Sequence, residues 1–101
     1  MKYKIIQLKD IAKCKYAFMN YNYAKTHGFS FDDYEVVYEG DTDDLKLKFG
    51  SIDANHILES LFVIFNNNHP KDYKGHSISV SDIIELDGVA YYCDSFSWKA
   101  L

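Results

Sequence analysis

The sequence predicts a single α+β domain in which a mainly antiparallel sheet of four to six strands packs against one main helix. The chain has 101 residues, the size of one domain covering residues 1–101, and its hydrophobic content of 48% can build one core. An amphipathic helical pattern spans about residues 54–66. A hairpin pattern spans about residues 82–94, close to the C-terminal end.

The hairpin is predicted by Asp87-Gly88, which separates two apolar runs. This pair suits a two-residue type I′ turn, because both central residues need a positive φ. The turn sets Leu86 opposite Val89 and, further along, Ile83 opposite Tyr92. The face predicted to meet the core carries Ile84, Leu86, Val89, Tyr91 and Cys93, and the other face carries Ile83, Glu85, Ala90, Tyr92 and Asp94.

The helix over 54–66 has recognisable ends. Asp53 is its predicted N-cap, and Ile52 and Ile57 can form a hydrophobic staple around it. Pro70 lies shortly after the helix, and the residue before a proline avoids the helical region. Its apolar residues recur every three or four positions: Ala54, Ile57, Leu58, Leu61, Phe62, Ile64 and Phe65.

Residues 2–8 alternate imperfectly, which predicts a central strand partly covered on both faces. Tyr3 and Ile5 would share one face, opposite Ile6 and Leu8. A second strand is expected at 14–19, where the composition also allows a helix. A short helix is expected within 20–28, capped by Asn20 or Asn22 and followed by Gly28.

Two more strands are expected in the middle of the chain. Residues 34–39 have a strand composition, with Tyr34, Val36 and Tyr38 predicted on one face. Residues 45–49 alternate and could form a short edge strand. Between them lies an acidic turn, which lacks the Glu that ends an EF-hand loop because the twelfth position from Asp41 is Ile52.

Composition narrows the classes of function. The net charge of −4 disfavours unspecific binding to a phosphate backbone and suits a partner with a basic groove. Cys14 and Cys93 are expected to be free thiols in a reducing compartment. No apolar run approaches the length of a membrane span or a signal peptide, so we expect a cytoplasmic protein. The oligomeric state stays open.

Catalytic and metal sites find little support in the pattern. The four histidines, His27, His56, His69 and His76, show no helical metal-ligand spacing, and no metal or cofactor is expected. His76, Asp82 and Cys93 could form the active site of a small hydrolase or transferase. However, the alternation places Cys93 on the core face, where a thiol is not activated. We therefore expect a protein that is not an enzyme.

The segment HPKDYKGHSISVSDIIELDGVAYYCDSFSW carries a family pattern. It resembles the YodL-like domain family of Firmicutes and their mobile elements, and IIQLKD, YAFMNY and YEVVYEG upstream extend the resemblance over nearly the whole chain. Ser97-Trp98 stands where the family usually has Gly-Phe. The resemblance implies a domain of plasmids, conjugative elements or phages, and it implies no reaction and no catalytic residue.

Three functions follow as alternatives. The leading hypothesis is a protein-binding accessory factor of a mobile genetic element, in one form an inhibitor of a host defence nuclease of anti-CRISPR or anti-restriction type. A second is nucleic-acid binding by the loop over 71–76. A third is a purely structural motif. The polar residues expected to form a recognition surface are Tyr73, Lys74, His76, Ser77, Ser79, Asp82, Asp94 and Ser95. The acidic residues expected to contact a partner are Glu35, Glu39, Asp41, Asp43 and Asp44.

Overall fold

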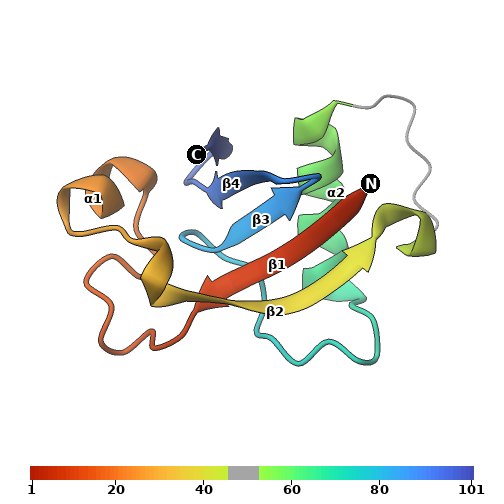
Figure 1. The fold of residues 1–101 in the computed structure, drawn as a ribbon, viewed down its shortest axis with the longest axis horizontal. Coiled ribbons are helices and arrows are strands. Elements are labelled where there is room, and N and C mark those ends of the chain that lie inside the picture. Colours follow the sequence, from red (N-terminus) through yellow and green to blue (C-terminus); the bar gives the residue numbers. More distant parts are fainter. Residues whose placement is uncertain (46–52) are drawn as a thin grey trace.

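The computed structural model describes residues 1–45 and 53–101 (Figure 1). Its strands are β1 (Lys2–Leu8), β2 (Tyr34–Asp41), β3 (Ile83–Leu86), β4 (Val89–Cys93) and β5 (Trp98–Ala100). Its helices are α1 (Tyr21–Thr26) and α2 (Ala54–Asn67), with short 3-10 turns at Phe31–Asp33 and Thr42–Leu45. No helix in the described part of the chain is long and apolar enough to cross a bilayer.

The five strands form one antiparallel sheet in the order β2-β1-β3-β4-β5. α2 lies behind this sheet in the view of Figure 1. The predicted α+β class, the main helix and the C-terminal hairpin are thus confirmed. β1 is an interior strand, between β2 and β3. Its residues from Ile5 to Leu8 are buried on both faces of the sheet, as its imperfect alternation predicts.

The main core lies between the sheet and α2. Ile57, Leu58, Leu61 and Phe65 come from one face of the helix and are almost fully buried. They meet alternate residues of the strands: Tyr3, Ile5, Ile84, Leu86, Cys93 and Trp98. The hairpin face predicted to meet the core is therefore the one that packs on α2.

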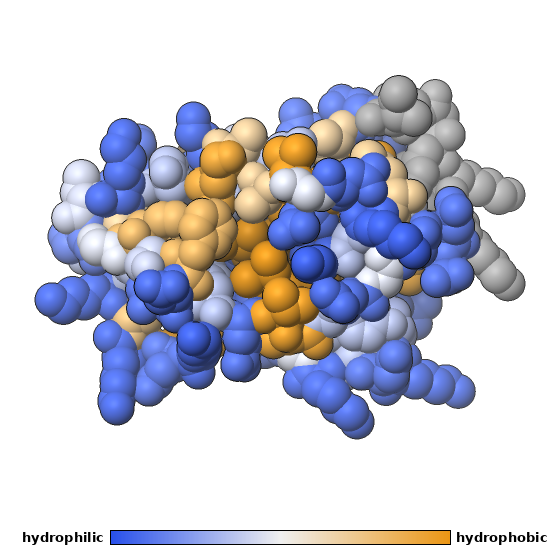
Figure 2. Space-filling model, viewed as in Figure 1, coloured by the Kyte–Doolittle hydropathy of each residue, from blue (hydrophilic) through white to orange (hydrophobic). Residues whose placement is uncertain are grey.

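A second core lies on the opposite face of the sheet. Ile83 and Tyr92, which the sequence assigns to the less buried face, are completely buried there. They pack with Tyr34, Tyr16 and Ala24 beneath the segment that carries α1. The sheet therefore has two apolar faces at this end. The hydrophobic band across the middle of Figure 2 lies on this side, with hydrophilic side chains around it.

The expected strand over 14–19 is wrong. These residues form successive turns, and Phe18 adopts a positive φ of 66°, which a strand residue does not have. The backbone N–H of Phe18 donates to Ser81 Oγ at 2.9 Å, and the Tyr92 hydroxyl donates to the Met19 carbonyl at 2.7 Å. Bonds to distant parts of the chain replace the pairing that a strand would have made.

The face assignment within β2 is only half right. Val36 pairs with Ile6 and Tyr38 pairs with Ile5, so Val37 is an extra residue in a bulge. Because β2 has one residue more than β1 over this stretch, the side chains of β2 change faces at the bulge. Tyr34 and Val36 therefore face the second core, whereas Tyr38 packs in the main core.

The local signals are confirmed. Asp87 and Gly88 have φ values of 45° and 88°, as a type I′ turn requires, and the predicted hairpin register is observed. Asp53 caps α2 by accepting from the backbone N–H of Asn55, and Asn20 caps α1. Leu45 belongs to a 3-10 turn, and the rest of the expected 45–49 strand, like Ile52, lies outside the described residues.

Candidate functional site

A buried polar cluster sits where the loop after α2 meets β1 and β3. Its centre is Gln7, a β1 residue that points to the α2 side and is only 1% exposed. Gln7 Nε2 donates to the His76 carbonyl at 2.9 Å and to Asp82 Oδ2 at 3.1 Å. Gln7 Oε1 accepts from the His76 backbone N–H at 3.2 Å. One amide thereby joins the loop to the start of the hairpin.

His76 is held mainly through its backbone. Its carbonyl also accepts from the Tyr73 hydroxyl at 2.6 Å. Its Nδ1 lies 2.7 Å from the Ser77 carbonyl, an acceptor, and 3.3 Å from Gln7 Nε2, a donor. The same Nδ1 lies 4.0 Å from Asp82 Oδ2. The ring stands at the surface, with the side chain 40% exposed.

Asp82 is the buried acid of the cluster. Its Oδ2 accepts from Gln7 and from the Ser79 backbone N–H at 3.0 Å. Burial raises the pKa of the Asp82 carboxyl to about 6, against the opposing effects of the Ser79 hydrogen bond and the nearby His76. Asp82 therefore anchors its own loop through Ser79 and joins it to β1 through Gln7.

Gly75 allows this cluster to close. A β-carbon on Gly75 would lie 2.5 Å from the Tyr73 hydroxyl and 2.6 Å from Gln7 Oε1, closer than carbon contacts allow. Gly75, which lies in the segment that carries the family resemblance, therefore has a packing reason at this position. Its φ is not positive, so the requirement is space and not backbone conformation.

A second group of polar contacts faces the α1 side. The Tyr34 hydroxyl donates to the Ser81 carbonyl at 2.7 Å, while Ser81 Oγ holds Phe18. Asp94 Oδ1 accepts from the backbone N–H groups of Tyr21 and Ser95, at 3.2 and 2.9 Å. Asp94 is half-buried and joins β4 to α1, so it differs from the surface residue that alternation suggests.

The sequence-predicted recognition residues thus separate into two groups. Asp82, His76 and Ser79 belong to the Gln7 cluster on the α2 side, and Asp94 and Ser95 belong to the α1 side. These contacts favour a structural role for the motif. Lys74, Ser77 and Ser95 are exposed.

Tyr73 is not available for stacking on a nucleic-acid base. Its side chain is 6% exposed, and its ring meets Phe65 at a centroid distance of 4.9 Å. Lys71 and Lys74 are exposed on the same loop, so the loop keeps its positive charge but presents no tyrosine ring beside it.

Cys93 is an inert thiol in this fold. It is 5% exposed, and burial raises the pKa of its thiol to about 12, so the reactive thiolate is scarce at neutral pH. Cys14 is half-buried, and both cysteines are free. No group of histidine, cysteine and carboxylate side chains in the described parts of the chain could hold a metal ion.

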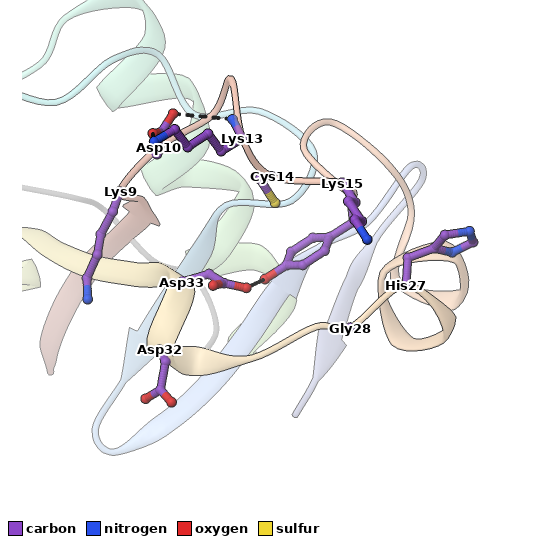
Figure 3. Close-up of a pocket in the computed structure, with 10 residues that line it drawn as sticks. Lys9, Asp10, Lys13, Cys14, Lys15, His27, Gly28, Asp32 and Asp33 are labelled. Carbon is purple, nitrogen blue, oxygen red and sulfur yellow. Dashed lines mark hydrogen bonds and ion pairs between the residues drawn. The ribbon is translucent and has the colours of Figure 1, made fainter.

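A surface cavity of about 510 Å³ lies between the 9–16 turns and the 27–33 segment. Figure 3 shows that its side chains do not converge: Lys9, Asp32 and His27 point in different directions. The Asp33 carboxylate already accepts a hydrogen bond from the Tyr16 hydroxyl, at 2.7 Å. Mixed charges without a common focus give no defined binding site here.

The predicted acidic residues lie along one border of the molecule. Glu35, Glu39 and Asp41 belong to β2, the outermost strand, and Asp43 and Asp44 follow it in the 3-10 turn. All except Asp41 are exposed. On the β1 side, Lys4 lies 3.7 Å from Glu39, and Lys2 lies 3.3 Å from Asp41.

Gln7 was not singled out by the sequence reasoning, although it organises the buried cluster. A signal was present: a polar residue at the position that continues the Tyr3 and Ile5 face of a central strand must be satisfied inside the protein. In the part of the chain that the structure describes, no buried side-chain nitrogen or oxygen lacks a partner.

Comparison with known protein families agrees with the resemblance seen in the sequence. No curated protein and no solved structure is significantly similar to the chain. The family model of the YodL-like domain matches residues 2–101, which covers both polar groups and the whole sheet. The chain therefore belongs to the YodL-like domain family.

Proposed function

We propose that this domain is a non-enzymatic protein-binding accessory factor of a mobile genetic element, acting in the cytoplasm of its host. Two features support a role without catalysis, because side chains that could act in a reaction are engaged in the fold or buried. The motif carboxylates Asp82 and Asp94 hold distant segments of the chain together. The thiol of Cys93 is buried beside the core.

The acidic border carries this proposal. Glu35, Glu39, Asp43 and Asp44 are exposed on one strand and the turn that follows it, on a domain whose net charge is −4. Among the described residues, Glu35 and Asp44 form no ion pair, so their charge faces solvent. Such a surface attracts a basic partner from a distance and favours a complementary orientation on contact.

A specific form of the proposal is an inhibitor of a host defence nuclease, of anti-CRISPR or anti-restriction type. Nucleases bind the phosphate backbone through clustered Lys and Arg. An acidic border of a small domain can occupy such a groove and exclude nucleic acid by charge and by bulk.

The test is a pull-down from host lysate at low and moderate salt with three forms of the domain. Glu35→Lys reverses a charge on the acidic border, and Asp32→Lys makes the same change on the exposed 3-10 turn outside it. We expect the wild type and Asp32→Lys to retain the same partner, and Glu35→Lys to lose it. Retention of no protein at either salt concentration would overturn the proposal.

A nucleic-acid-binding accessory role for the 71–76 loop is the alternative. The exposed side chains of Lys71 and Lys74 support this alternative. The burial of the Tyr73 ring and the net charge of −4 speak against it. A gel shift at about 50 mM salt with single- and double-stranded DNA and RNA decides between the two. Retardation that Lys71→Ala with Lys74→Ala removes would favour the loop.

A further inference from the structure

β2 is the outermost strand of the sheet, and its outer side has no strand partner among the described residues. The Thr42 N–H donates to the Met1 carbonyl at 2.9 Å. Along an antiparallel strand, every second residue bonds the neighbouring strand, and the residues between them point their N–H and C=O groups the other way. Since Thr42 bonds β1, the backbone groups of Asp41 and Glu39 point away from β1. On the other side of the bulge, the Lys9 N–H donates to the Asp33 carbonyl. Counting from that bond, the backbone groups of Val36 also point away from β1.

A shallow groove of about 550 Å³ runs beside this open edge. Its lining combines the strand itself with Asp72 from the loop after α2: Val36, Val37, Tyr38, Glu39 and Asp72. The Tyr38 hydroxyl donates to Asp72 Oδ1 at 2.9 Å, which fixes one wall. Val36 is 49% exposed, so the edge offers an apolar contact between its carboxylates.

The charge on this edge selects what can pair with it. Glu35, Glu39 and Asp72 are exposed at or beside the groove. A second copy of β2 would bring the same carboxylates opposite each other, and like charges directly opposite are destabilising. The register places Glu35 on the α2 side of the sheet, as it does Tyr38, which holds Asp72, whereas Val36 and Glu39 share the opposite side. A strand with Lys or Arg at alternate positions would instead meet Glu35 and Asp72 with its cationic face, while its other face contacts Val36.

Resting on the protein-binding function above, we propose that β2 binds its partner by strand addition, taking a cationic extended segment as a sixth strand of the sheet. Main-chain hydrogen bonds to the outward groups of Val36, Glu39 and Asp41 give the affinity, and the alternating side chains give the selectivity. The opposite border of the sheet, β5, has only three residues and is a poorer template.

The first experiment uses a synthetic peptide as long as β2, eight residues, in which Lys alternates with Val. A matched peptide carries N-methyl groups along one edge, which removes its backbone donors there but keeps its charge. We expect the parent peptide to bind the domain and N-methylation to weaken it by about tenfold or more, because several hydrogen bonds are lost. Equal binding of the two peptides would overturn strand addition.

Two variants of the protein separate charge from backbone pairing. Glu39→Gln removes the charge, and Glu39→Pro removes the charge and the outward N–H, a position where an edge strand tolerates proline. We expect Glu39→Pro to bind the peptide about fivefold more weakly than Glu39→Gln does, the cost of one hydrogen bond. Equal affinities, in variants that melt alike, would contradict the inference.

The two proposals can fail separately. A lysate partner lost with Glu35→Lys but bound equally by Glu39→Gln and Glu39→Pro would keep the protein-binding function and overturn strand addition. A domain that sediments as a dimer through β2 at low salt would also overturn it, because the edge would then accept its own strand.

Discussion

Gln7 and Asp82 lie 75 positions apart in the sequence and are joined by a hydrogen bond of 3.1 Å between Gln7 Nε2 and Asp82 Oδ2. This contact links β1 to the start of the C-terminal hairpin. The second hydrogen of the same amide goes to the His76 carbonyl. The loop over 69–82 is therefore anchored on Gln7, which lies in the upstream segment IIQLKD.

Gln7→Ala is expected to destabilise the fold. The substitution removes three hydrogen bonds and leaves the buried Asp82 carboxylate with one fewer donor. We expect the free energy of unfolding to fall by about 2–4 kcal/mol, because unsatisfied buried groups lose their full desolvation energy. Urea unfolding measures this directly. The control is Glu35→Ala, an exposed position that pairs with Gln7 on the neighbouring strand and should change stability by less than about 0.5 kcal/mol.

Asp94→Ala gives a second, independent test on the α1 side. Alternation alone predicts a tolerant surface position, with a change within about 0.5 kcal/mol. The structure instead gives Asp94 two backbone donors, from Tyr21 and Ser95. We therefore expect a loss of about 1–2 kcal/mol, together with faster amide exchange in α1. A silent substitution would show that the start of α1 does not depend on this carboxylate.

The two cysteines should differ in reactivity. Burial raises the pKa of the Cys93 thiol to about 12, whereas Cys14 is half-buried in a turn. At neutral pH, we expect a thiol reagent such as dithionitrobenzoate to modify Cys14 first and Cys93 only on unfolding. The Cys14→Ser variant isolates Cys93. Its rapid labelling in the folded protein would contradict the buried, inert thiol.

Elements set by local chemistry could be predicted from the sequence. Asp87-Gly88 requires two positive φ angles that few other pairs adopt, and Asp53 caps α2 with its own side chain. The residues 14–19 could not be predicted in the same way. Phe18 is held in a turn by Ser81, a partner 63 positions away, so no neighbouring residue reveals its conformation.

The acidic residues were identified from sequence, but their placement was not. Whether Glu39 lies on a central or an outer strand depends on the order of strands in the sheet, which is a property of the whole fold. The bulge at Val37 is also invisible locally, because it exists only relative to the pairing of β1. The open edge of β2 therefore emerges only from the structure.

The last prediction concerns the dependence of stability on pH. Burial raises the pKa of Asp82 in the folded protein to about 6, above its ordinary value of 3.8. The folded state therefore holds this proton more tightly than the unfolded chain does. Through this group, stability is highest below about pH 4, falls as the pH rises towards 6, and levels off above, a change of about 3 kcal/mol.

Asp82→Asn isolates that contribution. Its amide oxygen can still accept from Gln7 and from the Ser79 N–H, but the side chain no longer ionises. Asp41, whose pKa is lowered mainly by the backbone hydrogen bond from Asp43, acts in the opposite direction in both proteins and cancels in the comparison. We expect the stability of Asp82→Asn relative to wild type to rise from pH 4 to pH 7. A constant difference over that range would mean that Asp82 ionises at its ordinary pKa and that His76, 4.0 Å away, offsets the cost of burial.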